Sequence, residues 1–232
     1  MCHQRFRANT KTINMNKDTV KKAVIAGATC LVGSHLLKQL LNDPRYQEIH
    51  VPGRRAPELT DPRIIFHACD FETFESLPTQ GINEVYCALG TTIKKAGSQD
   101  KFREIDFDAV INLARWAAGI KCSHFVVISS MGANPRAGNF YLRTKGQMEQ
   151  VLKTCGLENL TIIRPSLLLG HRHEFRPGEK LSEWIMRPLR YVMVGPLKKY
   201  RPIKAQQVAK AMMNLAQINI GDIFIVENND LT

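Results

Sequence analysis

The feature that most constrains the fold of this chain is a glycine turn that joins an apolar run to a leucine-rich stretch. Residues 23–26 are small and apolar, which predicts a buried strand, and residues 31–41 place leucines at helical spacing. The turn between them has Gly27 and Gly33 at its ends. Because glycine lets the backbone turn tightly and approach its neighbours closely, this order predicts a strand–turn–helix corner of a parallel α/β sheet.

Such a corner also attracts anions, since the start of the helix offers unpaired N–H groups and a partial positive charge. The turn therefore predicts a pyrophosphate site for a dinucleotide, formed by Gly27, Ala28, Thr29, Cys30, Leu31, Val32 and Gly33. Cys30 stands at the middle position of the spacing G-x-x-G-x-x-G, nearest the expected pyrophosphate. Its side chain is expected to push the dinucleotide outward or to weaken its binding. A purely structural strand–helix corner is the alternative.

Short apolar runs alternate with helical stretches along most of the remaining chain. Further strands are predicted at residues 49–51, 64–66, 83–87, 125–128, 160–163 and 223–226, and helices at 99–118, 141–153 and 206–216. This alternation with short connections predicts an α/β fold, a Rossmann-like doubly wound parallel sheet with helices on both faces. We expect residues 20–232 to form a single domain of this kind.

Two segments fall outside the alternation. Residues 1–19 are polar and basic, and we expect either a flexible N-terminal arm or a true start at Met15. Residues 167–204 are expected to form a small C-terminal flap on the substrate side, with a short helix near 181–186 that Pro188 stops. The apolar residues of this flap are expected to pack on the core in preference to a membrane.

Composition bears on location and partners. No apolar run approaches the ~20 residues of a membrane span. The six cysteines contain no C-x-x-C pair, and His171 and His173 lack a third ligand, so we expect reduced thiols, a cytoplasmic protein and no metal site. The net charge of +11 gathers after residue 164. A solvated basic face explains it better than nucleic-acid binding, because no aromatic residues are interleaved with it.

The end of the second predicted strand indicates which dinucleotide the turn would bind. In this architecture an acidic residue ~20 residues after the glycine turn binds the adenosine ribose of NAD. This chain has Arg54 and Arg55 there instead. Because guanidinium groups pair bidentately with phosphate, the two arginines favour the 2′-phosphate of NADP(H) over NAD(H). An ordinary pair of surface arginines is the alternative.

Two further strand ends carry candidate cofactor contacts. After the third predicted strand, Asp70 and Phe71 are expected to frame the adenine, Asp70 at its amino group and Phe71 against its face. A helix N-cap formed by Asp70 is an equal and compatible alternative. After the fourth predicted strand, a segment rich in small residues lets a ligand approach the sheet edge, at Ala88, Leu89, Gly90 and Thr91.

The candidate chemistry lies after the fifth predicted strand. Tyr141 and Lys145 are four residues apart, so on a helix they share a face. A lysine ammonium beside a phenol stabilises the phenolate, and the tyrosine can then exchange a proton with a substrate oxygen near neutral pH. The hydroxyl of Ser129 or Ser130, at the strand end, can orient that oxygen, and the lysine can also hold the nicotinamide ribose. A structural Tyr–Lys pair is the alternative.

This set of residues resembles the atypical branch of the short-chain dehydrogenase/reductase superfamily, and within it the NAD(P)H-binding oxidoreductases of the Tat-interacting-protein type and their bacterial relatives. The motifs that carry the resemblance are Gly27–Gly33, Ala88–Thr92, His124–Ala133, Asn139–Gly146, Arg164–Gly170 and Gly195–Ile203. They extend over residues 20 to 228. The resemblance implies a Rossmann fold, NADPH along the sheet edge and a Ser-Tyr-Lys set at Ser129 or Ser130, Tyr141 and Lys145. It also places Arg164, Pro165 and Ser166 among the cofactor contacts.

Two functions are consistent with these features. The first is an NADP(H)-dependent oxidoreductase that reduces a small carbonyl substrate. The second is an NADP(H)-sensing regulatory protein with little or no turnover, which Cys30 and the basic C-terminal region would suit, the latter by docking an acidic protein partner. Because exposed helices in this fold often pair, a homodimer is also considered.

Overall fold

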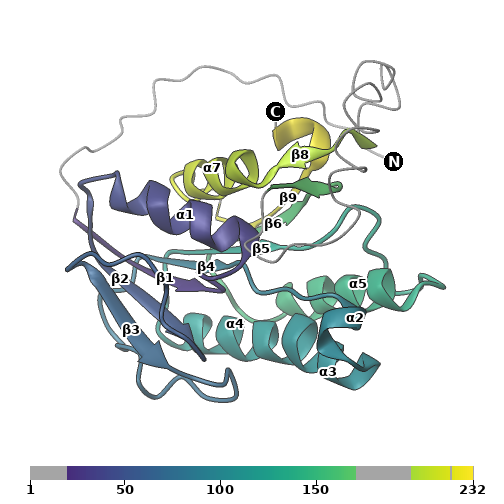
Figure 1. The fold of residues 1–232 in the computed structure, drawn as a ribbon, viewed down its shortest axis with the longest axis horizontal. Helices are drawn as coiled ribbons and strands as arrows, with labels where there is room; N and C mark the ends of the chain where they lie inside the picture. The colour runs from purple at the N-terminus through teal and green to yellow at the C-terminus, as the bar shows by residue number, and fades with distance from the viewer. Residues whose placement is uncertain (1–19, 171–199, 220, 232) are drawn as a thin grey trace.

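Seven parallel strands form one sheet in the order β3-β2-β1-β4-β5-β6-β9 (Figure 1). The structure is a computed structural model that describes residues 20–170, 200–219 and 221–231. The strands are β1 Lys21–Ala26, β2 Tyr46–Gly53, β3 Ile64–Ala68, β4 Glu84–Cys87, β5 His124–Ile128, β6 Leu160–Arg164 and β9 Ile223–Glu227. The predicted Rossmann-like parallel sheet is therefore confirmed.

Helices cover both faces of this sheet, so the fold is doubly wound (Figure 1). On one face lie α1 Leu31–Leu41 and α7 Ala205–Leu215. On the other lie α3 Gln99–Arg103, the π-helical turn η1 Glu104–Asp108, α4 Ala109–Gly119 and α5 Phe140–Leu152, with α2 Ile93–Ala96 beside them. No helix in the described part of the chain is both long and apolar enough to cross a membrane.

Strand order reverses between β1 and β4, which are neighbours in the sheet. The strands β2 and β3 extend the sheet to one side of β1, and β5, β6 and β9 extend it to the other side of β4. In open parallel sheets, ligands bind at the carboxyl ends of the strands where the order reverses. The turn after β1 and the turn after β4 meet at this point.

Glycine is required at both ends of the turn after β1. Gly27 has φ +85, and a Cβ there would lie 2.6 Å from the carbonyl oxygen of Ala88 in the turn after β4. A Cβ on Gly33 would lie 2.1 Å from the carbonyl oxygen of Gly27. The first turn of α1 therefore rests directly on the backbone at the end of β1, and any side chain at either position would force them apart.

The structure differs from the sequence prediction in three places. The second strand extends through Pro52 to Gly53; Pro52 lies beyond the last residue of β2 that pairs with β1, so its missing N–H does not interrupt that ladder. The predicted helix at 99–118 is three consecutive helical segments, with a π-helical turn in the middle. No helix follows Asp70, whose side chain instead accepts the backbone N–H of Glu72 at 3.0 Å.

The ends of the predicted flap lie side by side. The short strands β7 Leu168–Leu169 and β8 Ile203–Lys204 pair in parallel as a separate two-stranded sheet. Close to β7, a Cβ on Gly170 would lie 2.7 Å from Cδ1 of Leu31, so this end of the segment passes over the start of α1. The predicted helix near 181–186 lies outside the described residues.

At the amino edge of the sheet, a buried carboxylate gathers polar groups from several elements. Glu84 of β4 accepts hydrogen bonds from the phenols of Tyr46 at 2.5 Å and Tyr86 at 2.6 Å. Its other oxygen lies 2.5 Å from Nζ of Lys21. Gln217, just after α7, donates to both Glu84 and Tyr46. These bonds join β1, β2, β4 and the end of α7, far from the carboxyl ends of the strands.

The glycine turn provides a direct test of this packing. Gly33→Ala is expected to lower the free energy of unfolding by about 1–3 kcal/mol, the usual cost of an extra methyl group in a filled site, and to weaken dinucleotide binding. Urea unfolding followed by circular dichroism measures the first effect, and nicotinamide fluorescence the second.

The matched control is Gly119→Ala at the end of α4, where nothing lies within 4 Å of an added Cβ. That variant should be neutral or more stable by up to ~1 kcal/mol, as alanine is preferred in helices. Equal effects of the two substitutions would contradict the close packing described for Gly33.

Candidate functional site

The turn after β1 has the properties that a pyrophosphate requires. Its glycines leave the space that a Cβ would fill, and α1 begins immediately after it. The N-cap residue Cys30 makes no side-chain capping hydrogen bond, and the first turn of α1 contains no acidic residue. Within the described residues, no acidic side chain of this first turn neutralises the positive end of the helix, and the residues present fit the phosphates of a dinucleotide.

Cys30 adopts an ordinary backbone conformation, with φ −80 and ψ 165. Its N–H donates to the carbonyl oxygen of Gly27 at 2.9 Å, and its carbonyl accepts the N–H of Ser34 at 2.9 Å. This extended geometry is open to any residue, so position 30 has no conformational need for glycine. Its effect on the distance to the phosphates stays a prediction.

Arg54 and Arg55 follow the carboxyl end of β2, where the ribose-reading position was predicted. Both are exposed, and neither forms an ion pair with any described residue. Since Gly53 pairs with Ala68, the two arginines leave the sheet beside the end of β3. Two unpaired guanidinium groups therefore stand beside the strand end where the adenosine ribose is expected.

The end of β3 borders a cavity of about 300 Å³ lined by Ala68, Cys69, Asp70, Thr73, Glu75 and Ser76. Phe71, the residue after Asp70, has a left-handed backbone conformation with φ 73. Its carbonyl oxygen accepts a hydrogen bond from Asn112 of α4 at 3.3 Å. Its ring packs edge-on against Phe74, 6.4 Å between centroids. Asp70 thus lines a cavity at the predicted adenine position, whereas the ring of Phe71 packs in part against the hydrophobic core.

The segment after β4 is held by a residue that the sequence did not single out. The backbone N–H of Thr91 donates to Oδ2 of Asp106 at 2.8 Å. A Cβ on Gly90 would lie 3.6 Å from Oδ1 of the same carboxylate. Asp106 lies in the π-helical turn η1 and is 1% exposed. Ala88 and Leu89 are buried, and Ala88 lies directly beside Gly27, so this segment packs against the glycine turn.

Asp106 also forms a buried ion pair with Lys145 of α5. Nζ of Lys145 lies 2.7 Å from Oδ1 of Asp106, and the two side chains are 3% and 1% exposed. Burial alone would lower the pKa of Lys145, but the charge of Asp106, the nearby Tyr141 and the hydrogen bond that the lysine donates to Asp106 outweigh burial, so the pKa of Lys145 is raised. The lysine therefore stays an ammonium in the interior.

Tyr141 lies in the first turn of α5, one turn before Lys145. Its ring packs against Phe102 of α3, 5.5 Å between centroids, and is partly exposed. The N-cap Asn139, which accepts the N–H of Leu142 at 3.1 Å, fixes the start of this helix. The loop before it packs tightly on α5, because a Cβ on Gly146 would lie 2.2 Å from the backbone of Asn134.

The two candidate serines differ in their surroundings. The hydroxyl of Ser129 is buried and donates to Oε1 of Glu149 at 2.5 Å. The hydroxyl of Ser130 is partly exposed, and its only hydrogen bond to a described residue is a long one, 3.3 Å, to the carbonyl oxygen of Met131. Ser129 is therefore engaged inside the protein, and Ser130 has the hydroxyl that a ligand at the sheet edge can reach.

The three predicted residues at the end of β6 and just after it also have partners within the protein. Arg164 pairs with Glu149, its Nε and Nη2 at 2.9 and 2.5 Å from the carboxylate oxygens, and its Nη1 lies 2.9 Å from Glu227. Pro165 is buried, and the N–H of Ser166 donates to Oδ1 of Asn228 in η3 Asn228–Leu231. Their predicted contacts with the cofactor stay predictions, and the guanidinium of Arg164 is already shared by two carboxylates.

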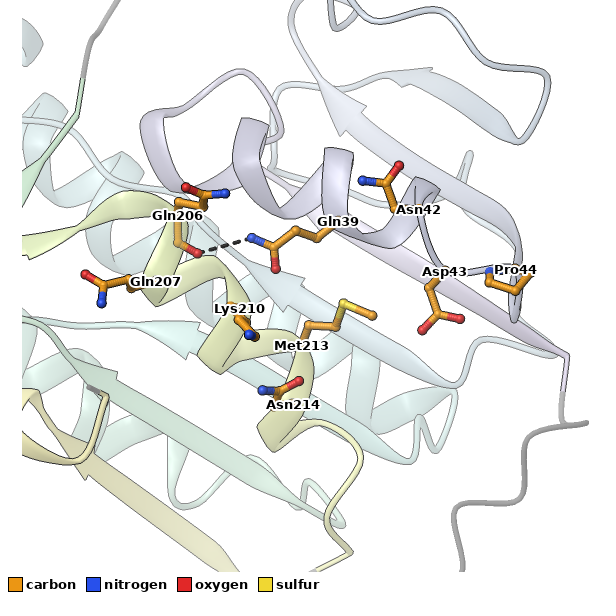
Figure 2. Close-up of a pocket in the computed structure, with 9 residues that line it drawn as sticks. All are labelled: Gln39, Asn42, Asp43, Pro44, Gln206, Gln207, Lys210, Met213 and Asn214. Carbon is orange, nitrogen blue, oxygen red and sulfur yellow. Dashed lines mark hydrogen bonds between the residues drawn. The ribbon is translucent and has the colours of Figure 1, made fainter.

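A groove of about 560 Å³ lies elsewhere, on the outer surface between α1 and α7 (Figure 2). Figure 2 shows mainly amide side chains around it, and Gln39 of α1 donates to the carbonyl oxygen of Gln206 across it at 3.1 Å. Its lining includes neither the glycine turn nor Tyr141 or Lys145, so it is separate from the candidate site. The described residues contain no group of three or more metal-ligating side chains.

The fold and this edge define a nucleotide-binding Rossmann protein. Residues 27–217 match the family model described as NAD(P)H-binding, and the chain belongs to that family. Protein HTATIP2 of Rattus norvegicus is 30% identical over 214 residues, which cover 90% of this chain and 86% of that protein. Protein FMP52, mitochondrial, of Candida albicans is 31% identical over 219 residues, covering 89% and 95%. The predicted membership of the atypical dehydrogenase/reductase branch is confirmed.

A solved structure shares the fold at low sequence identity. MoeE5 in complex with UDP-glucose and NAD superposes with a TM-score of 0.66 at 16% identity, over 90% of this chain and 79% of that chain. At this identity the likeness concerns the fold alone.

The relatives contradict one sequence prediction. Four fungal relatives, 30% to 33% identical to this chain, have "mitochondrial" in their names. The cytoplasmic location predicted from cysteine usage is therefore wrong as a general assignment. Reduced cysteines did not discriminate between these compartments.

The ion pair between Asp106 and Lys145 can be tested by its effect on stability. Asp106→Asn leaves the lysine ammonium buried without a counter-charge, and breaking one partner of a buried pair costs about 3–5 kcal/mol. The loss should shrink as pH rises toward the ordinary lysine pKa of about 10.4, because the neutral amine needs no partner. Urea unfolding at several pH values measures both effects.

Asp108→Asn is the matched control, since Asp108 belongs to the same π-helical turn but is exposed. It should change the free energy of unfolding by less than ~0.5 kcal/mol. A small, pH-independent loss in Asp106→Asn would show that Lys145 does not depend on this carboxylate.

Proposed function

We propose that this protein is an NADP(H)-dependent oxidoreductase that reduces a small carbonyl compound. The observation that carries the proposal is the buried Asp106–Lys145 pair, one helical turn from Tyr141 and at the edge where the glycine turn lies. A buried ammonium next to a partly exposed phenol is costly to maintain for structure alone. It is the arrangement that a proton donor requires.

Each residue has a role in this proposal. Tyr141 donates a proton to the carbonyl oxygen, and the ammonium of Lys145 stabilises the phenolate that remains. Asp106 keeps the lysine charged and in place, so it is a positioning residue. Ser130 donates a hydrogen bond that orients the carbonyl. When bound, the nicotinamide supplies the hydride, so that carbonyl, reduced cofactor and a proton become an alcohol and the oxidised cofactor.

The preference for NADP(H) is supported by Arg54 and Arg55. Both are exposed and without an ion-pair partner among the described residues, and they follow β2, the strand whose end faces the adenosine ribose in this architecture. The cavity beside Asp70 would then receive the adenine. The glycine turn and the start of α1 would hold the pyrophosphate between these groups and the reacting end.

The proposal is tested first at Tyr141. Tyr141→Phe keeps the ring against Phe102 and removes one oxygen. Proton transfer by a positioned side chain contributes roughly 10²–10⁴ in rate, so kcat/KM for any reducible carbonyl should fall by at least ~10²-fold while NADPH affinity changes little. Steady-state NADPH consumption and nicotinamide fluorescence measure the two quantities. Unchanged reduction would rule out the assignment, and binding without turnover by the natural sequence would favour a cofactor-sensing role.

Cofactor choice is tested at the two arginines. The double variant Arg54→Ala with Arg55→Ala should lose NADPH affinity about tenfold or more for each charged hydrogen bond, at ~1.5–3 kcal/mol each. Its affinity for NADH should be preserved. The control is Arg115→Ala with Lys153→Ala. Both residues are exposed, Arg115 in α4 and Lys153 at the end of α5, and the two substitutions remove the same amount of positive charge. If NADPH and NADH were weakened equally, the arginines would not bind the 2′-phosphate.

A further inference from the structure

The carboxyl edge of the sheet is uneven in charge. The segments after β4, β5 and β6, together with the segment at β8, lie at the end of the sheet where Tyr141 and Ser130 are found. Residues 88–98, 129–143, 164–170 and 200–204 contain no acidic residue. Their basic residues are Lys94, Lys95, Arg136, Arg143, Arg164, Arg201 and Lys204.

Several of these charges are not neutralised by the described part of the protein. Arg164 is paired with Glu149 and Glu227. Lys94 and Arg136 are exposed and form no ion pair with a described residue. The guanidinium of Arg143 donates to the carbonyl oxygens of Ala137 and Gly138, both at 3.0 Å, and lies over the ring of Phe140, with no carboxylate partner among the described residues. The residues 171–199 between these segments are themselves more basic than acidic in sequence.

The cofactor does not account for this charge. Its pyrophosphate and 2′-phosphate have partners in the glycine turn and at Arg54 and Arg55, which follow β1 and β2. The neighbouring segment after β3 is acidic instead, with Asp70, Glu72 and Glu75. Positive potential is therefore concentrated on the half of the edge that carries the proposed proton donor, where no phosphate of the cofactor is expected.

We infer that the substrate of the proposed reaction carries a carboxylate or phosphate group beside its carbonyl. This inference rests on the proposed function and names the substrate class for the same site. Lysine and arginine side chains that gather at one part of the sheet edge raise the local concentration of an anion and increase its rate of capture. Because Lys94 and Arg136 are exposed, this attraction is screened by salt.

Equilibrium binding tests the inference without turnover. Benzoate, phenyl phosphate and benzamide are titrated by calorimetry into the protein saturated with NADP⁺, at low and at physiological ionic strength. At least one anion is expected to bind about tenfold more tightly than benzamide, with an advantage that shrinks as salt is added. Which of the two binds better distinguishes a carboxylate from a phosphate substrate. Equal binding of all three, or no binding of either anion, overturns the inference.

Charge reversal identifies the residues that hold the anion. Lys94→Glu with Arg136→Glu should abolish the preference for the anion. The control is Arg115→Glu with Lys153→Glu, which makes the same change in net charge. Lys153 lies at the opposite end of α5 from Tyr141, ~18 Å along the helix at 1.5 Å per residue. The control should keep the preference. If the first variant kept it as well, the basic segments would not be the anion site.

A turnover measurement separates this inference from the proposed function. The rates of reduction of 4-carboxybenzaldehyde and of its methyl ester are compared with NADPH as the reductant. A higher kcat/KM for the carboxylate supports both proposals. Selective anion binding with no reduction of either aldehyde contradicts the oxidoreductase and leaves the anion site standing. Reduction of both aldehydes at equal rates, with no selective binding, contradicts the anion site and leaves the oxidoreductase standing.

Discussion

The contact between Gly33 and the carbonyl oxygen of Gly27 is the constraint on which the site depends. A Cβ at position 33 would lie 2.1 Å from that oxygen, so only glycine lets α1 begin directly above the end of β1. This contact aims the positive end of α1 along the carboxyl edge of the sheet. Gly27 in turn touches the backbone after β4, and that segment is held by Asp106, the partner of Lys145. One continuous set of contacts thus links the glycine turn to Lys145, which lies one helical turn from Tyr141, the proposed proton donor.

Most of the fold could be predicted from the sequence because five of the seven strands lie inside the sheet, between the edge strands β3 and β9. Strands such as β5 are buried along their whole length and appear as uninterrupted apolar runs. The glycine turn then indicated where β1 ends and α1 begins. The second strand was harder, since Pro52 and Gly53 are typical of a turn, although β2 continues through both. The segment 167–204 offered only the pattern of one short helix near 181–186, and only the two ends of the segment could be compared with the structure.

Parts of the candidate site could be predicted where the spacing of two residues determines how they lie. Tyr141 and Lys145 are four residues apart in α5, so they lie on the same face of the helix. Asp106 was missed because a single carboxylate in a helix is usually exposed. The available signal was its register: it lies four residues after Phe102 and four before Val110, on the apolar face of the helix, where a charge needs a buried partner. The sequence pattern could not show whether Ser129 or Ser130 has the accessible hydroxyl. The difference between them depends on Glu149 of α5, which accepts the hydrogen bond of Ser129 and is distant in the sequence.

The carboxylate of Glu84 has a consequence for how such a chain can diverge. Tyr46, Tyr86, Lys21 and Gln217 all direct their polar atoms to it from different parts of the sequence. Replacing any one of these residues leaves a buried polar group of another without its hydrogen-bond partner. Substitutions in this cluster are therefore tolerated only when several residues change together. At the opposite rim, exposed residues such as Lys94 and Arg136 share no such group with the other described residues and can be substituted one at a time. Selection can therefore change the ligand specificity at the carboxyl edge of the sheet while the Glu84 cluster at the amino edge stays unchanged.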